Sequence, residues 1–167
     1  MAVSFEDAVP LSRLPGLVLV SDTPKGRGVF TMVPIPRGTH IDTNPVLVLS
    51  PTDNEAHIKH TVLYHYTYNW PAPTSDAASA PSQPLQAVVL GLGSLFNHSS
   101  RDQNVVWTRD VARGTVTYRA ARDIATGEEL CISYGARLTF VDADAISEEP
   151  EEAENVLRSI QVDELTR

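Results

Sequence analysis

The chain has 167 residues and a formal net charge of −8, with 42% hydrophobic and 20% charged residues. This composition is typical of a soluble globular protein, and the length predicts one domain with a core of its own. No apolar run approaches the roughly 20 residues that span a bilayer, and acidic Glu6 and Asp7 argue against a secretory leader. The single cysteine, Cys131, excludes an internal disulfide and a cysteine-rich zinc site, and it favours a reducing compartment.

The acidic charge is concentrated at the C-terminal end. Residues 142–167 hold nine acidic residues against Arg158 and Arg167, so the rest of the chain is close to neutral. Phosphate contacts need clustered Lys and Arg, so direct binding to nucleic acid is not expected. The acidic tail suits a basic protein or peptide, and a role in solubility alone explains it equally well.

Apolar segments separated by turn residues predict short strands in the first half. Turn chemistry is strong at 22–26 and at 36–38. The strands are predicted at 17–20, which we expect to be buried, at 28–33 and at 46–49.

Residues 52–86 predict an insertion made of a helix and a loop. Asp53 can cap a helix that runs to about Tyr68, with an apolar side built from Ile58, Val62, Leu63 and Tyr66. Four prolines among Ala and Ser at 71–84 predict a mobile loop, because this composition buries too little apolar surface to become ordered.

The second half predicts more strands and a terminal helix. A strand or short helix is expected at 87–90 and a last core strand at 130–133. Segments 105–108 and 115–118 predict a hairpin. From Ser147 onward a helix is expected, with Ala153, Val156, Leu157 and Ile160 on one face. The predicted fold class is therefore mainly β, with two peripheral helices.

Two polar segments stand out from these elements. Lys25-Gly26-Arg27-Gly28 lies between two strands, where glycines let a ligand approach the backbone closely. A plain hairpin turn is the alternative, and neither a Rossmann fingerprint nor a P-loop is present. Asn97-His98-Ser99 follows an apolar run directly, and buried polar groups of this kind need partners.

Two other chemistries are weakly supported by the sequence. A Ser-His-acid hydrolase could use Ser99, His98 and Asp102, but neighbours in sequence rarely face one another and no Gly-x-Ser-x-Gly elbow exists. His57 and His60 have the spacing of adjacent helical turns, yet no complete zinc ligand set can be found. We therefore expect no metal.

The third distinctive segment runs from Glu128 to Gly135 and places Tyr134 at the end of an apolar strand, where its hydroxyl needs a partner. The order of three motifs in this chain resembles that of the SET-domain protein lysine methyltransferases: a Gly-x-Gly loop, then Phe-Asn-His-Ser, then Glu-Glu-Leu-x-x-x-Tyr. The resemblance also includes Ile35-Pro36-Arg37-Gly38 and Asn104, and it covers roughly residues 15–136. The compact length is similar to that of the small stand-alone fungal SET proteins, without a cysteine-rich post-SET segment.

The resemblance implies a SET-domain (β-clip-like) fold of small antiparallel sheets with a pseudoknot-like crossing, a helical insertion (52–86) and a C-terminal helix. S-adenosylmethionine is the implied cofactor. The backbone of Lys25, Gly26, Arg27 and Gly28 would hold its methionine part, the Asn97 side chain would bind its amino group, and the His98 backbone would contact the adenine. Tyr134 would both contact the cofactor and act as the catalytic residue. For the lysine channel we expect the aromatic residues Tyr66, Tyr68 and Phe140.

The implied activity is transfer of methyl groups to a lysine amine of a basic protein, with a histone tail as the expected substrate and the nucleus as the expected location. The cytoplasm, a non-histone substrate and a catalytically inactive SET binding module are the alternatives. Because a zinc-binding post-SET segment is missing, residues 137–167 or a second chain must close the channel, which makes a homodimer through this segment a further expectation.

Overall fold

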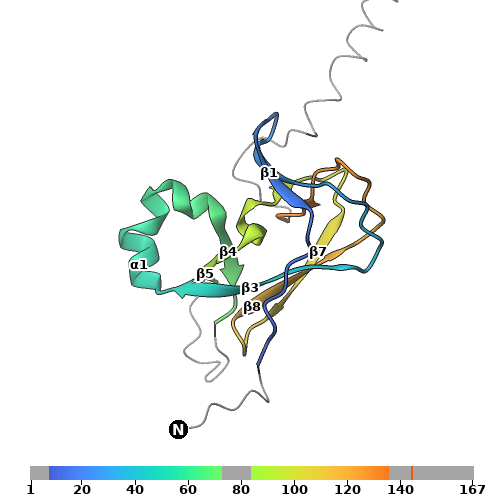
Figure 1. Ribbon diagram of the computed structural model, residues 1–167. Coiled ribbons are helices and arrows are strands. Elements are labelled where there is room, and N and C mark those ends of the chain that lie inside the picture. Colours follow the sequence, from blue (N-terminus) through green and yellow to red (C-terminus); the bar gives the residue numbers. More distant parts are fainter. Residues whose placement is uncertain (1–7, 73–83, 136–143, 145–167) are drawn as a thin grey trace, which may run out of the picture.

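Three small sheets make up the structure (Figure 1), a computed structural model that describes residues 8–72, 84–135 and 144. The hairpin of β1 (Leu17–Thr23) and β2 (Gly26–Thr31) forms the first sheet. A five-stranded antiparallel sheet has the order β4-β5-β3-β8-β7, and the third sheet pairs β6 with β9. These strands are β3 (His40–Leu49), β4 (Thr67–Trp70), β5 (Leu85–Val89), β6 (Asn97–His98), β7 (Val105–Asp110), β8 (Thr115–Ala120) and β9 (Cys131–Ile132).

The core forms around β8, which has one buried face. Val116, Tyr118 and Ala120 are buried, whereas Arg119 between them is exposed. The Tyr118 ring packs edge-to-face on Phe96, with 5.0 Å between ring centroids. Complete burial of a side chain such as Phe96 contributes about 1.5–3 kcal/mol to folding. The predicted hairpin is confirmed, because β7 and β8 pair antiparallel over their whole length.

The prediction of one helix from residue 53 to about 68 is wrong. The segment forms α1 (Pro51–Ala56) and two separate 3₁₀ helices, η1 (Ile58–His60) and η2 (Val62–Tyr66). The residues expected on its apolar face are not buried, and Val62 is 78% exposed. In the described part of the chain this face is therefore too little buried for packing to stabilise a longer helix.

Side-chain caps explain where these helices begin and end. The Thr61 hydroxyl donates to the Ile58 carbonyl at 2.8 Å and accepts from the Leu63 N–H at 3.3 Å. Local bonds of this kind compete with the bonds of a continuous helix. At the start of α1 the cap is Ser50 rather than Asp53, since the Ser50 hydroxyl accepts from the Asp53 N–H at 3.0 Å.

The ends of the insertion join the main sheet. β4 pairs with β5 and β5 pairs with β3, all antiparallel. Trp70 and Ala87 are buried there. The insertion therefore contributes strands that position Tyr68 against the core, as well as the peripheral α1 on the left of Figure 1.

The first strand is present, but the expectation that it is buried is wrong. Val18, Leu19 and Val20 on β1 are 36%, 47% and 37% exposed. β1 pairs with β2 alone, so its other edge has no strand partner in the described part of the chain. Its partner strand is the buried one, with Val29 completely covered.

The expected crossing of two distant segments is formed by β6 and β9. They pair in parallel, with Asn97 opposite Cys131 and His98 opposite Ile132. The Ser99 N–H then donates to the Ile132 carbonyl at 3.1 Å. This places the Asn-His-Ser segment directly beside the strand that leads to Tyr134.

Asn104 fixes the crossing from inside. Its Oδ1 accepts from the Cys131 N–H at 2.8 Å, and its Nδ2 donates to the Glu129 carbonyl at 2.7 Å and to Glu128 Oε1 at 2.9 Å. The residue is 1% exposed. One buried carboxamide therefore satisfies backbone groups of the segment that leads into β9.

The predicted C-terminal helix and the homodimer through 137–167 lie outside the described residues, apart from Asp144. Among the described residues no helix is long and apolar enough to cross a membrane. No group of His, Cys, Asp or Glu with metal-binding geometry occurs among the same residues.

Replacing Asn104 with leucine tests this arrangement. Leucine has a similar size but leaves the Cys131 N–H and the Glu129 carbonyl without their partner, and each buried unpaired group costs about 1–3 kcal/mol. We expect Asn104→Leu to lower the free energy of unfolding, measured by urea denaturation, by about 2–4 kcal/mol. The matched change at exposed Asn69 should stay within about 0.5 kcal/mol, and an equal loss in both variants would contradict the role of Asn104.

Candidate active site

The β1–β2 turn supplies one wall of the site. Gly26 has a φ of +85°, a conformation that favours glycine. Thr23 closes the turn, since its hydroxyl donates to the Gly26 carbonyl at 2.6 Å and accepts from the Lys25 N–H at 3.2 Å. Apart from the neighbours of Gly26 in the chain, no atom of the described residues lies within 4 Å of the position that its Cβ would take, so the turn borders open space.

Gly28 lets this hairpin approach two polar side chains. A Cβ at Gly28 would overlap the Glu129 carboxylate and would lie 3.1 Å from Asn97 Nδ2. That Nδ2 donates to the Arg27 carbonyl at 2.9 Å and to Glu129 Oε1 at 2.7 Å. With both donors directed at these oxygens, Asn97 keeps Oδ1 as an acceptor for a ligand donor.

His98 contributes its backbone and its ring in different directions. Its carbonyl accepts from Lys25 Nζ at 3.1 Å. Its ring Nδ1 accepts from the Tyr134 N–H at 3.1 Å, and the two rings lie 5.4 Å apart. The ring therefore supports Tyr134, as expected for a residue that is not a catalytic base.

Ser99 does not have the surroundings of a nucleophile. It is completely buried. Its hydroxyl donates to Asp144 Oδ2 at 2.6 Å and accepts from the Asp102 N–H at 2.8 Å. These bonds disfavour the hydrolase alternative, because the Ser99 hydroxyl donates to a carboxylate and not to a histidine.

Tyr134 follows β9 and directs its phenol inward. The residue is 44% exposed, but its hydroxyl donates to the Phe96 carbonyl at 2.7 Å. Burial of the phenol group, followed by electrostatic interactions with the ionisable groups of Cys131, Tyr66 and Glu129, raises the pKa of Tyr134 to about 12. The hydroxyl is thus neutral and a hydrogen-bond donor at physiological pH.

A cavity of about 340 Å³ opens beside Tyr134. It is lined by aromatic and polar side chains, and of the residues expected in the lysine channel it includes Tyr66 and Tyr68, whereas Phe140 lies outside the described residues. Its lining residues are Tyr64, His65, Tyr66, Thr67, Tyr68, Asn69, Gln86, Gly93, Ser94, Trp107, Arg109, Ile132, Ser133 and Tyr134.

Tyr68 is held rigidly in the wall of this cavity. Its hydroxyl donates to the Gly93 carbonyl at 2.7 Å and accepts from the Tyr118 hydroxyl at 3.2 Å. Burial raises the pKa of both phenols above the usual range. The Tyr68 ring also packs edge-to-face on Trp107, with centroids 5.4 Å apart.

Arg27 joins the hairpin to the cavity. Its Nη2 donates to the Tyr66 hydroxyl at 3.0 Å, and its guanidinium carbon lies 6.0 Å from the centroid of that ring. Arg27, which belongs to the Lys25–Gly28 turn, and Tyr66 are 39 residues apart in sequence. The contact therefore links the predicted cofactor loop and the predicted substrate side.

Sequence reasoning missed several residues of this region. Glu129 was expected only as part of a motif, and Asp144 only as part of an acidic tail. Arg109 was not expected at all, although it lies over Trp107 and Trp70, at 4.8 and 5.8 Å, and donates to the Asn69 carbonyl at 3.0 Å. The spacing of Trp107 and Arg109 on one strand is a signal that could have found this pair.

The same region fits the cofactor that the sequence suggested. Asn97 Oδ1 and the Glu129 carboxylate are oxygen acceptors suited to an ammonium group. The backbone at Gly26 borders open space, whereas Gly28 is buried and lets Asn97 and Glu129 approach the hairpin closely. These residues would hold an amino-acid moiety of the kind that S-adenosylmethionine carries.

Comparison with known proteins agrees with this geometry. The SET domain family model matches residues 26–135. A histone-lysine N-methyltransferase of Schizosaccharomyces pombe, H3 lysine-37 specific, is 41% identical over 159 residues, which cover 92% of this chain and 99% of the relative.

Solved structures share the fold. The histone lysine methyltransferase DIM-5 of Neurospora is 22% identical with a TM-score of 0.53, over 75% of this chain and 54% of that one. KRYPTONITE in complex with mCHG DNA and SAH is 21% identical with a TM-score of 0.53, over 78% of this chain and 26% of that one.

The fold and the site thus define a mainly β protein in which β6 and β9 form a separate parallel pair. The chain belongs to the SET domain family, and like its relative from Schizosaccharomyces pombe it is a protein-lysine methyltransferase.

Ionisation of the buried phenols predicts a loss of stability at alkaline pH. The pKa of Tyr134 is raised to about 12, and those of Tyr68 and Tyr118 are raised as well. A phenol in the unfolded chain ionises near pH 10, so the stability from these groups is complete below about pH 10 and is lost as pH rises toward the folded pKa. We expect the free energy of unfolding in urea to fall between about pH 10 and 12, and Tyr134→Phe to reduce that fall. An identical fall in the variant would contradict the inward placement of this phenol.

Proposed function

We propose that the protein is an S-adenosylmethionine-dependent protein-lysine N-methyltransferase that acts on a histone H3 tail. The observation that carries the proposal is the position of Tyr134. Its N–H is bonded to His98 of the Asn-His-Ser segment, its hydroxyl points to Phe96, and its side chain lines the aromatic cavity. It thus lies where the proposed cofactor segment meets the proposed lysine channel.

The residues around the hairpin have separate proposed roles in binding. The backbone of Lys25, Gly26, Arg27 and Gly28 borders the methionine part, and Asn97 Oδ1 accepts from its amino group. The His98 backbone borders the adenine. When bound, S-adenosylmethionine supplies an activated methyl group on a positively charged sulfur.

The cavity would prepare the lysine amine. A free lysine has a pKa near 10.4, so only about one in a thousand is neutral near pH 7.4. Aromatic walls from Tyr66, Tyr68 and Tyr134 exclude water and lower that pKa by desolvation, and an adjacent positive charge lowers it further. The rigid Tyr68 wall and the Tyr134 hydroxyl then fix the direction of the amine, which an in-line displacement requires.

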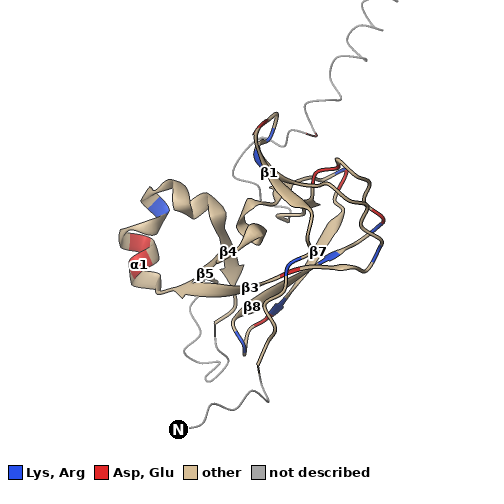
Figure 2. Ribbon diagram, in the orientation of Figure 1, with Lys and Arg blue, Asp and Glu red and all other residues tan. Residues whose placement is uncertain are grey.

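A histone H3 tail is the substrate that these observations favour. The relative from S. pombe carries H3 lysine-37 in its name and aligns over nearly the full length of both chains. The acidic residues after 142 would attract a basic tail. Figure 2 shows charges of both signs interspersed over the described strands and loops, rather than one continuous basic stripe, which agrees with a protein substrate. A nuclear location follows from such a substrate, with the cytoplasm as the alternative.

Replacing Tyr134 with phenylalanine separates catalysis from cofactor binding. We expect the variant to bind S-adenosylhomocysteine with unchanged affinity in calorimetry and to lose about 10²-fold or more in methyl transfer, because only the hydroxyl is removed. The transfer is measured by mass spectrometry after incubating nucleosomes, free histones and cell extract with labelled cofactor.

Three outcomes of this experiment have different meanings. Full activity of Tyr134→Phe would overturn the catalytic assignment. Label only on other proteins of the extract would replace the histone by a non-histone substrate. Cofactor binding by the natural chain without any transfer would favour the inactive binding module.

Gly28→Ala tests the proposed cofactor wall. The new methyl group would displace the Glu129 carboxylate and break its bond to Asn97 Nδ2, so the carboxamide would lose its orientation. We expect affinity for S-adenosylhomocysteine to fall about tenfold or more, which corresponds to about 1.4 kcal/mol. Val18→Ala, an exposed change on the same hairpin, is the control and should bind normally. Normal binding by Gly28→Ala would remove this hairpin from the cofactor site.

A further inference from the structure

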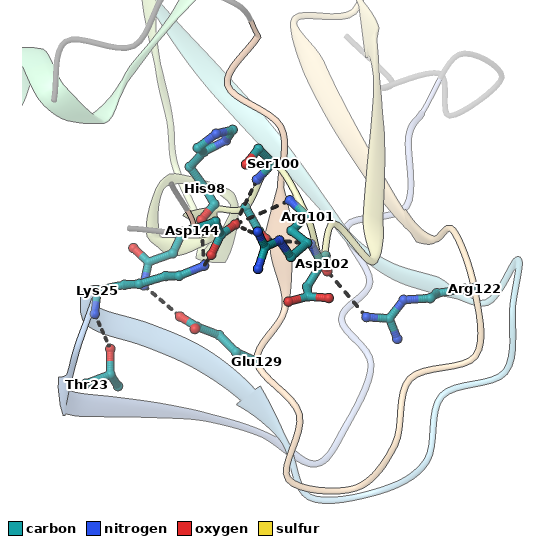
Figure 3. Close-up of polar contacts among 11 residues, drawn as sticks. Thr23, Lys25, His98, Ser100, Arg101, Asp102, Arg122, Glu129 and Asp144 are labelled. Carbon is teal, nitrogen blue, oxygen red and sulfur yellow. Dashed lines mark hydrogen bonds and ion pairs between the residues drawn. The ribbon is translucent and has the colours of Figure 1, made fainter. Parts of the chain in front are cut away.

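One carboxylate gathers donors from two separate segments beside the candidate site (Figure 3). Asp144 Oδ2 accepts from the Ser99 hydroxyl at 2.6 Å, the Ser100 N–H at 3.0 Å and the Arg101 N–H at 3.3 Å. Asp144 Oδ1 forms an ion pair with Lys25 Nζ at 3.0 Å. The carboxylate therefore joins the β1–β2 turn to the turn that follows β6.

This ion pair is shielded from water more than an ordinary surface pair. The side chains of Lys25 and Asp144 are 21% and 13% exposed, and Ser99 is completely buried. The hydrogen bond from Ser99, followed by the contact with Lys25 and the Arg101 N–H, lowers the pKa of Asp144 well below its usual range. Asp144 is therefore ionised throughout the physiological pH range.

Lys25 transmits this contact to the candidate site. Its Nζ donates to the His98 carbonyl at 3.1 Å as well as to Asp144. The Ser99 N–H of the same peptide unit points to the Ile132 carbonyl of β9, so the His98 carbonyl points away from β9. Figure 3 shows Lys25 lying between Asp144 and Glu129, next to this carbonyl.

We propose that Asp144 is a positioning residue for the cofactor site: it fixes Lys25 and the turn at 99–101, and thereby the backbone of His98 that borders the adenine. This inference rests on the proposed function, because it concerns the same cofactor. A neutral amide at this position cannot serve equally, since its NH₂ group would face either the donors at 99–101 or the Lys25 ammonium. The sequence motifs do not reveal this role, because Asp144 lies outside them and 45 residues beyond its partner Ser99.

The test compares Asp144→Asn with the natural chain. We expect S-adenosylhomocysteine to bind five- to tenfold more weakly in calorimetry, the KM for S-adenosylmethionine to rise by a similar factor, and kcat to stay within twofold. Glu55→Gln makes the same change in net charge on the peripheral helix α1 and is the matched control. It should leave all three values unchanged.

Lys25→Met and the double variant complete the test. Because Asp144 acts partly through Lys25, the double variant should lose less affinity than the two single losses together, since coupled residues are not additive. Fully additive losses would overturn the route through Lys25. Lys25→Met also keeps the test decisive if Asp144→Asn does not fold, which thermal unfolding reports. In that case a cofactor affinity of Lys25→Met equal to that of the natural chain overturns the proposal.

The remaining outcomes are also decisive. Unchanged or tighter binding by Asp144→Asn overturns the positioning role, and tighter binding would mean that Asp144 competes with the ligand. An equal loss in Glu55→Gln would assign the effect to overall charge and overturns it as well. If the natural chain binds no S-adenosylhomocysteine, the proposed function fails first, and this result is distinct from all the others.

Discussion

The parallel pairing of β6 with β9 is the interaction on which the site depends. Two residues of each strand suffice to place Asn97 and His98 beside the segment that ends in Tyr134. Such a short pair has few ladder bonds of its own, and strands of this length are not stable alone. Asn104 supplies what is missing, because one buried carboxamide satisfies groups on three residues of the incoming segment. The active-site geometry is thus held by a polar contact inside the core.

The strands of the main sheet could be predicted from the sequence because their alternation and turns are local signals. The hairpin of β7 and β8 is the clearest case. The helix from 53 to 68 could not be predicted correctly, since its apolar spacing was helical but no surface covers Val62. The prediction that β1 is buried was wrong for a related reason. A run of Val and Leu does not indicate whether another layer of the structure covers the strand.

The candidate site shows the same division between local and distant information. Lys25, Gly28, Asn97 and Tyr134 belong to motifs whose order indicated the family, and the structure brings them together. Glu129, Arg109 and Asp144 were missed as site residues because each has a partner far away in sequence: Asn97 is 32 positions from Glu129, Asn69 is 40 from Arg109, and Ser99 is 45 from Asp144. Burial of a charged group beside specific donors is a property of the folded chain alone.

These contacts make the cofactor side and the substrate side mechanically dependent on each other. Arg27 bonds Tyr66 in the aromatic cavity, while the carbonyl of the same residue accepts from Asn97. A shift of the β1–β2 turn must therefore move a cavity wall as well as the proposed methionine subsite. Since methyl transfer requires the donor and the amine to be in line, one turn that contacts both sides of the site reduces the freedom of each. The short β1–β2 hairpin, exposed on its outer strand, is stabilised from within by these polar contacts.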